Sequence, residues 1–328
     1  MEGKRKGLQI KHRYWVLLLI LLNIAAVMFV QPVRPHIQVA PETLTKKPLF
    51  TLPVIGDFYL TNTQVMLVLV MIIIILLAYV VKRSVESGSL IPKGIAGAME
   101  MLVEALYNLT ESSAGKYAKT IFPWFATILI FVLVGNLMKL TPIVETFGLV
   151  HAVKAEGHPL QELLPGVYNI LPGKVAEGEQ GYHITPFFRG LPTDLNFTLA
   201  LALISVFMTQ VIGVRAQGAR YFTKFFNYVN LFKKPFFGAM DFLVGLLELI
   251  SEFSKILSFT FRLFGNMFAG AVLLFLVGSL VPVFAQSFVV LFEVFVGLIQ
   301  AFVFGMLTMV FMAQATQGHG GEHAEEAH

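Results

Sequence analysis

A run of 37 residues, from Ile256 to Phe292, contains a single charged side chain, that of Arg262. This run is longer than the about 20 apolar residues that an α-helix needs to cross the hydrocarbon core of a bilayer. A charged side chain at the centre of a bilayer costs roughly 2.5–3.5 kcal/mol on scales derived from insertion experiments. The sequence therefore predicts membrane helices and a functional reason for the charge at Arg262.

The composition of the chain supports the same class of protein. Of its 328 residues, 56% are hydrophobic and 13% are charged, whereas soluble domains carry about 25% charged residues. The chain has no cysteine, which excludes disulfides, thiolate metal sites and a cysteine nucleophile. Its basic residues form short clusters beside apolar runs, a pattern that orients membrane proteins, so we expect membrane lipid and no nucleic acid as a partner.

Apolar runs predict the membrane helices. They cover residues 14–30, 65–81, 121–140, 195–214 and about 236–312, and the last region is interrupted near Pro282 and so predicts two long helices in a hairpin. We expect an all-α polytopic membrane protein with five to six membrane helices. The number depends on whether residues 14–30 are a cleaved signal peptide or a membrane anchor.

The distribution of Lys and Arg predicts the orientation. Segments 1–13, 82–120 and 215–235 contain five each, and segments 31–64 and 141–194 contain three each. The positive-inside rule then places both termini in the cytoplasm. We divide the chain into an N-terminal anchor or signal segment with an outside segment (1–62), a membrane domain with half-channels (63–314) and a polar His/Glu-rich cytoplasmic tail (315–328).

Two further segments have simple interpretations. Residues 91–120 pair apolar with acidic positions and predict an amphipathic helix on the cytoplasmic surface. The tail contains His319, His323 and His328. These could bind a metal, but the composition favours a solvated tail, and we expect no metal and no cofactor.

The last two predicted helices carry polar stripes. A helix from about 236 to 280 would be roughly 60 Å long, about twice the hydrocarbon thickness, so it must tilt, bend or lie partly along the membrane. Its polar residues fall on one narrow stripe, and polar residues of the next helix recur at multiples of seven, which predicts a polar seam between facing stripes. The residues are Glu248, Ser251, Lys255, Ser258, Arg262 and Asn266, then Gln286, Glu293, Gln300 and Gln314.

The two charges Arg262 and Glu293 suit different roles. A guanidinium stays protonated and can only fix a positive potential, whereas the carboxyl of Glu293 can relay protons. A pump with one fixed cation needs a mobile carboxyl on another protein. Three alternatives remain: polar residues that hold helices together, a scaffold with a structural Arg262–Glu293 ion pair, and an independent ion-coupled secondary transporter.

Four strings resemble subunit a of the F-type ATP synthase. "FRLFGNMFAG" and "LIQAFVFGMLTMVFM" are similar to its last two helices, and "PTDLNFTLALAL" and "VGNLMKLTP" to motifs on the two preceding spans, so that the resemblance covers about residues 64–312. It implies a non-catalytic, proton-translocating stator subunit of a bacterial inner membrane, which provides two half-channels to the carboxyls of a c-subunit ring. The implied partners are that ring, a b-type peripheral stalk subunit and the remaining ATP synthase subunits. The chain itself has no phosphate-binding loop for ATP.

The resemblance also implies residue roles. Arg262 would keep an arriving ring carboxyl ionised and prevent a proton leak, supported by Asn266 and Gln300. Glu248, Ser251 and Ser258 would line the cytoplasmic half-channel, and Asn136, Asp194 and Glu293 the outer one. This chain departs from many relatives at Ala271, where they have an ionisable residue, and at Lys139, where they have an acidic or small one; we expect Lys139 to extend to the membrane interface.

Overall fold

The structure is a computed structural model, and it describes residues 12–29, 38–53, 56–86, 94–153, 157–171, 173, 175, 180–225, 235–281 and 284–317. Within these residues, five helical regions are long and apolar enough to cross a membrane. They are 62–86, 95–138, 195–224, 242–280 and 285–316. The prediction of an all-α polytopic membrane protein is therefore confirmed.

The helices follow the apolar runs of the sequence. The α-helices are α1 (His12–Phe29), α2 (Asn62–Glu86), α3 (Ile95–Ala114), α4 (Ala118–Met138), α5 (Leu195–Gln217), α7 (Pro235–Leu280) and α8 (Phe284–Thr316). Short 3-10 helices are η1 (Gly115–Tyr117), η2 (Leu191–Thr193) and η3 (Gly218–Lys224). The first eleven residues and the tail from residue 318, with its three histidines, lie outside the described residues.

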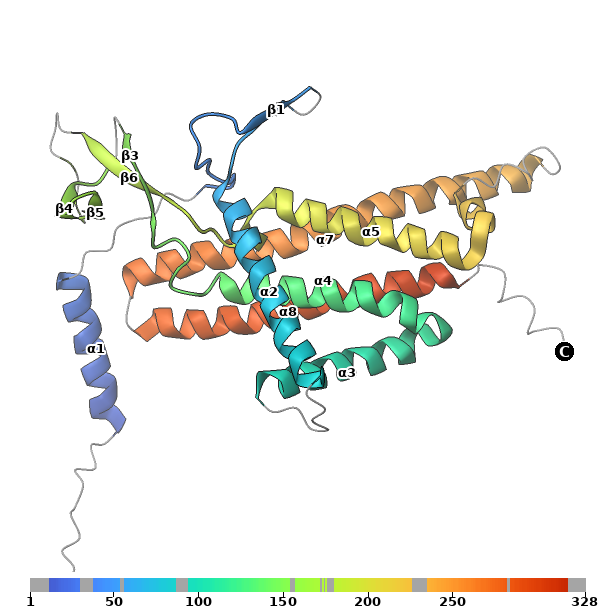
Figure 1. Cartoon of the computed structure of the whole chain (residues 1–328), viewed down its shortest axis with the longest axis horizontal. Helices are drawn as coiled ribbons and strands as arrows, with labels where there is room; N and C mark the ends of the chain where they lie inside the picture. Colours follow the sequence, from blue (N-terminus) through green and yellow to red (C-terminus); the bar gives the residue numbers. More distant parts are fainter. Residues whose placement is uncertain are drawn as a thin grey trace, which may run out of the picture.

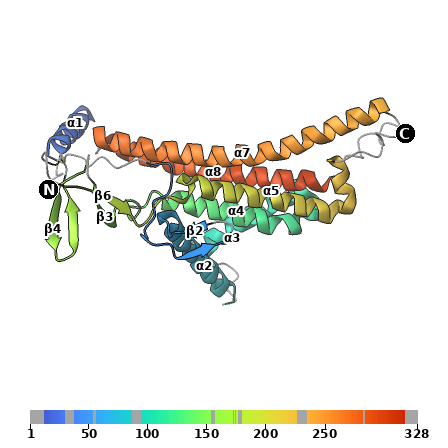
Figure 2. The ribbon, with the colours of Figure 1, turned by 90° about the horizontal axis from the view of Figure 1, so that it is seen from above.

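Helix α7 is one continuous helix of 46 residues, as the absence of proline predicts. At 1.5 Å per residue it is about 69 Å long, more than twice the about 30 Å hydrocarbon thickness. Figure 2 shows that α7 curves along its length while α8 runs beside it. The hairpin turn lies between Leu280 and Phe284, where the sequence predicts the break.

Helices α4, α5, α7 and α8 run side by side, and α2 crosses them steeply (Figure 1). One face of α7 supplies Phe259, Leu263 and Met267 to the core that these four helices share. The ring of Phe259 stacks on that of Phe304 of α8, with centroids 4.8 Å apart. Ser205 of α5 and Thr308 of α8 are joined by a buried hydroxyl hydrogen bond of 2.7 Å. The core therefore fixes which face of α7 points inward.

Short antiparallel strands lie outside the helical bundle. Within the described residues they form three pairs: β1 (Phe50–Leu52) with β2 (Gly56–Phe58), β3 (Gly148–Val153) with β6 (Gly181–Pro186), and β4 (Leu160–Leu164) with β5 (Val167–Ile170). Strands β3 to β6 lie at the end of the bundle where α7 turns into α8 (Figure 1). These strands are not among the elements predicted from the sequence.

Glycine at position 213 allows η3 to fold back onto α5. A Cβ atom at Gly213 would lie 2.6 Å from Cζ of Tyr221, and Tyr221 is itself 2% exposed. A Cβ atom at Gly135 of α4 would make an ordinary contact of 3.7 Å with Leu191. We expect Gly213→Ala to lower stability by about 1–3 kcal/mol through overpacking, and Gly135→Ala to leave it unchanged or raised. Thermal unfolding of the purified protein in detergent measures both, and equal stability of the two variants would contradict this packing.

Candidate functional site

A buried ion pair connects α7 and α8 with the residue that directly follows α4. Lys139 directly follows α4, and its ammonium donates to Glu293 Oε2 of α8 at 2.8 Å. It also donates to the carbonyl oxygen of Met267 of α7 at 3.0 Å. Lys139 is 8% exposed and Glu293 is 1% exposed. The pair thus replaces water as the partner of each charge.

One expectation and one alternative about these charges are wrong. Lys139 does not extend to the membrane interface, because the buried carboxylate of Glu293 provides a partner inside the bundle. Arg262 does not pair with Glu293, because the carboxylate faces α4 and the guanidinium lies on the exposed face of α7. The scaffold based on an Arg262–Glu293 pair is therefore excluded.

Asn136 lies one turn before Lys139 and belongs to the same cluster. Its Nδ2 donates to the carbonyl oxygen of Gly297 at 2.8 Å, four residues after Glu293 on α8. Asn136 is 1% exposed, and its Oδ1 has no hydrogen-bond partner among the described residues. The structure thus brings Asn136 and Glu293 to one place, as the sequence analysis expects.

Two glycines leave room for the pair. A Cβ atom at Gly270 of α7 would overlap the carboxylate of Glu293. A Cβ atom at Gly190 would lie 2.6 Å from Cγ of Lys139. Any larger side chain at either position would displace one member of the pair. We call Lys139, Glu293, Asn136 and the Met267 carbonyl the outer cluster.

Asp194 occupies a different position from the outer cluster. It is the N-cap of α5, where Oδ1 accepts from the backbone N–H of Asn196 at 2.9 Å. Its Oδ2 accepts from Thr63 Oγ1 of α2 at 2.8 Å. These bonds join α2 to α5, and the structure shows no hydrogen bond from Asp194 to Asn136 or Glu293 within its described residues.

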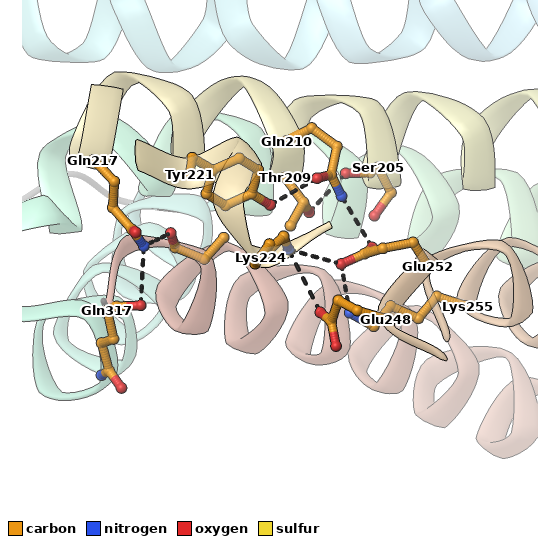
Figure 3. Close-up of polar contacts among 11 residues, drawn as sticks. Ser205, Thr209, Gln210, Gln217, Tyr221, Lys224, Glu248, Glu252, Lys255 and Gln317 are labelled. Carbon is orange, nitrogen blue, oxygen red and sulfur yellow. Dashed lines mark hydrogen bonds and ion pairs between the residues drawn. The ribbon is translucent and has the colours of Figure 1, made fainter. Parts of the chain in front are cut away.

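A second ion cluster joins α5, η3 and α7, about ten residues before Arg262 along α7 (Figure 3). Glu252 of α7, 8% exposed, accepts from Lys255 at 3.0 Å, from Lys224 at 3.2 Å and from Gln210 Nε2 at 2.9 Å. Tyr221 donates to Gln210 Oε1 at 2.7 Å, and Glu248 lies 3.6 Å from Lys224. We call these residues the inner cluster.

Glu252 is not among the site residues predicted from the sequence. Glu248 and Lys255 belong to the predicted polar stripe, whereas Glu252 lies beside that stripe. A signal was available, because Glu252 is three residues before Lys255 and four after Glu248, the spacings at which helical side chains meet. Within the described structure, Glu252 is the acid on which both lysines of the inner cluster converge.

Most of the polar stripe of α7 is not covered by α8 within the described residues. Lys255 lies 4.7 Å from the ring centroid of Phe311 of α8. Ser251, Ser258, Arg262 and Asn266 are exposed, whereas Phe259, Leu263 and Met267, on the face next to the stripe, are buried. The expected seam between facing stripes is therefore wrong for these residues, because the apolar face of α7 is the one that packs on its neighbours. Glu293 and Gln300 of α8 are buried.

Arg262 has little support from this chain. Its Nη2 donates to Ser258 Oγ at 3.3 Å, on the same exposed face. Among the described residues, no carboxylate lies within ion-pair distance of its guanidinium. Large apolar side chains, including Leu257 and Phe261, are exposed beside it.

Comparison with known proteins decides the family. Residues 64–313 match the family described as ATP synthase A chain, which is most of the chain and includes both clusters and Arg262. The chain belongs to this family. It is 27% identical over 178 residues to ATP synthase subunit a of Trichlorobacter lovleyi, a match covering 54% of each chain. It is 28% identical over 178 residues to that of Geobacter sulfurreducens, covering 54% of this chain and 55% of the relative.

A further relative is ATP synthase subunit a 3 of Pelobacter propionicus, 28% identical over 200 residues, covering 61% of this chain and 63% of the relative. The chain spans about half the length of the first two curated relatives that it matches. The family membership confirms the resemblance of the FRLFGNMFAG region. It does not favour the alternative of an independent secondary transporter.

The inner cluster gives a test of the buried charges. Glu252→Gln would leave Lys224 and Lys255 without the acid that they share, and removal of one partner from a buried pair typically costs about 3 kcal/mol. We therefore expect a clear loss of stability in thermal unfolding in detergent. The control is Glu86→Gln, which breaks a Lys82–Glu86 pair of 3.7 Å whose side chains are 72% and 65% exposed and is worth less than about 0.5 kcal/mol. Equal behaviour of the two variants would contradict a structural role for Glu252.

Proposed function

We propose that this chain is the non-catalytic stator subunit of a rotary ATP synthase, and that it conducts protons to and from carboxyls on a ring of c subunits. The observation that carries this proposal is the position of Arg262 on a face of α7 that the described chain leaves uncovered. Family membership supplies the context of a membrane-sector subunit. ATP chemistry belongs to other subunits of the complex.

Arg262 needs an anionic partner from outside this chain. A guanidinium remains charged at any physiological pH, and leaving it against lipid costs roughly 2.5–3.5 kcal/mol on insertion scales. An anion from another chain removes this cost. A ring carboxyl that passes Arg262 is such an anion, and the positive charge keeps it ionised by favouring its charged form. Ser258 and Asn266 are exposed on the same face and add polar contacts to this encounter.

The two clusters suit the ends of two half-channels. Counted along α7 at 1.5 Å per residue, Glu252 is about 15 Å before Arg262 and Gly270 is about 12 Å after it. Arg262 thus lies between the inner cluster and the outer cluster. The inner route includes Glu248, Ser251 and Ser258, and the outer route includes Asn136, Asp194 and Glu293, with Gln300 supporting the arginine. A proton cannot pass directly between the routes, because the fixed positive charge separates them.

The proposal includes an orientation and partners. Both termini lie in the cytoplasm of a bacterium, the multi-pass protein lies in its inner membrane, and strands β3 to β6 lie outside. The chain works beside the c-subunit ring with a b-type peripheral stalk and the remaining subunits. We retain the division of the chain predicted from the sequence. It has an N-terminal anchor or signal segment with an outside segment (1–62), a membrane domain with half-channels (63–314) and a polar cytoplasmic tail (315–328). Each proton that crosses the membrane contributes about 2.3 kcal/mol per 100 mV.

The direct test is ATP-driven proton pumping in inverted membrane vesicles. We expect Arg262→Ala to abolish pumping while the complex still assembles, because Arg262 is exposed and supports no packing. Arg83→Ala, which removes an exposed arginine in the last turn of α2, is the matched control and should pump normally. Normal pumping by Arg262→Ala would refute the proposed function.

Labelling of single introduced cysteines tests the orientation. Such labelling is specific because the chain has no cysteine of its own. A cysteine at the exposed Gln317 should react with a membrane-impermeant maleimide in inverted vesicles but not in spheroplasts. A cysteine at the exposed Gln161 of β4 should show the opposite pattern. Labelling of both from the same side would contradict the proposed topology.

A further inference from the structure

We propose that Lys139 and Glu145 are members of the outer proton relay, so that a proton enters through a Glu145–Lys139–Glu293 series and not through Glu293 alone. This inference rests on the proposed function and assigns two residues that the sequence analysis leaves without a role in proton movement. It is carried by the buried ion pair of Lys139 with Glu293 and by the packing of Lys139 against Gly190, in the same segment that bonds to the backbone of Glu145.

The first step is the geometry of the pair. Lys139 Nζ lies 2.8 Å from Glu293 Oε2 and 3.0 Å from the Met267 carbonyl oxygen. An ammonium has three N–H donors, and these two acceptors use two of them. Asn136 Oδ1, three residues earlier on the same helix face, is buried and has no partner among the described residues. The outer cluster thus offers a further acceptor beside the lysine for the remaining donor or a bridging water.

The second step is the proton transfer itself. A proton moves from Lys139 Nζ to Glu293 Oε2, so that one N–H bond breaks, one O–H bond forms and both groups become neutral. The carboxylic acid of Glu293 then releases the proton to an ionised ring carboxyl. The neutral amine of Lys139 accepts the next proton from the outer side. One proton has moved, and the site returns to its starting charge.

The third step connects Lys139 to the outer surface. Glu145 follows α4 in the segment that leads to β3, and it is half-buried with a φ of 62°, uncommon for a residue other than glycine. Its backbone N–H donates to the carbonyl oxygen of Phe188 at 3.0 Å. This bond ties the segment to residues 188–190, and Gly190 of that stretch packs against the side chain of Lys139.

The charges around the series are few and come from different elements. Burial raises the pKa of Glu145, while the positive charges of Arg189 and Lys139 oppose the rise and the negative charge of Glu42 adds to it. A carboxyl whose pKa is raised binds and releases protons closer to neutral pH. Helix α8 contributes Glu293 to the series, and α7 contributes the carbonyl of Met267.

A structural counter-ion would behave differently from a relay. An arginine at position 139 could hold the carboxylate of Glu293 but could not release a proton. A histidine could release one, near its ordinary pKa of about 6.5. Lys139→Arg and Lys139→His therefore separate the two roles.

The experiment measures ATP-driven pumping in inverted vesicles loaded with buffers of different pH. In such vesicles the interior corresponds to the outer side of the cell membrane. Copurification with the ring measures assembly. We expect Lys139→Arg to assemble and to lower pumping by about tenfold or more. We expect Lys139→His to pump with its optimum moved to lower interior pH. Glu145→Gln should lower pumping, whereas Glu162→Gln on the exposed strand β4 should not.

The contrary outcomes are distinct. Near-native pumping by Lys139→Arg would make Lys139 a counter-ion only and overturn the relay. If Lys139→Arg does not assemble, Lys139→His decides instead. An assembled Lys139→His complex that keeps the native pH profile, or that does not pump at any pH, would also overturn the relay. The proposed function is judged separately by Arg262→Ala. If that variant stops pumping while Lys139→Arg pumps normally, the relay fails and the stator function stands.

Discussion

The uncovered charge of Arg262 is the feature around which the rest of the molecule is arranged. Helix α7 has two unlike faces, and its apolar face packs into α4, α5 and α8 through Leu263 and Met267. Since the helix has 3.6 residues per turn, burying that face directs Arg262 outward. Packing of apolar side chains thus sets the direction of a charge that makes no contact with the core.

The buried charges on either side of Arg262 show a common design. Each cluster combines lysine with glutamate and joins α7 to another part of the fold. Buried ion pairs are weak sources of stability compared with well-packed apolar residues. Their presence at both ends of the polar face is consistent with a role in moving protons, in line with the proposed function.

Much of the fold follows from the sequence, because apolar runs and a break near Pro282 define the long helices without tertiary information. The FRLFGNMFAG string indicates the family, which the match over residues 64–313 confirms. The resemblance also implies that Asn136 and Glu293 belong to one half-channel, and the structure shows Asn136 hydrogen-bonded to the carbonyl of Gly297, four residues after Glu293 on α8. The roles of the individual residues in proton movement stay predictions.

Other features could not be predicted, for physical reasons. The Lys139–Glu293 pair joins residues 154 positions apart, so it depends on how helices pack and not on local spacing. The outward direction of the α7 stripe depends on which face its neighbours cover, and periodicity alone gives the stripe without its direction. Strands β4 and β5 are short and have an irregular register, which leaves little alternating pattern to detect.

The central claim is that the face of α7 that carries Arg262 meets the c-subunit ring. Disulfide cross-linking between α7 and the membrane helix of a ring subunit tests it most directly, because this chain has no native cysteine. Ala269 of α7 is exposed on the face of Arg262, and Ala301 of α8 is buried at 1% exposure. With a second cysteine beside the ring carboxyl, we predict that Ala269→Cys forms a cross-link in the assembled complex and that Ala301→Cys does not. A cross-link from Ala301→Cys with none from Ala269→Cys would show that another face of this protein meets the ring.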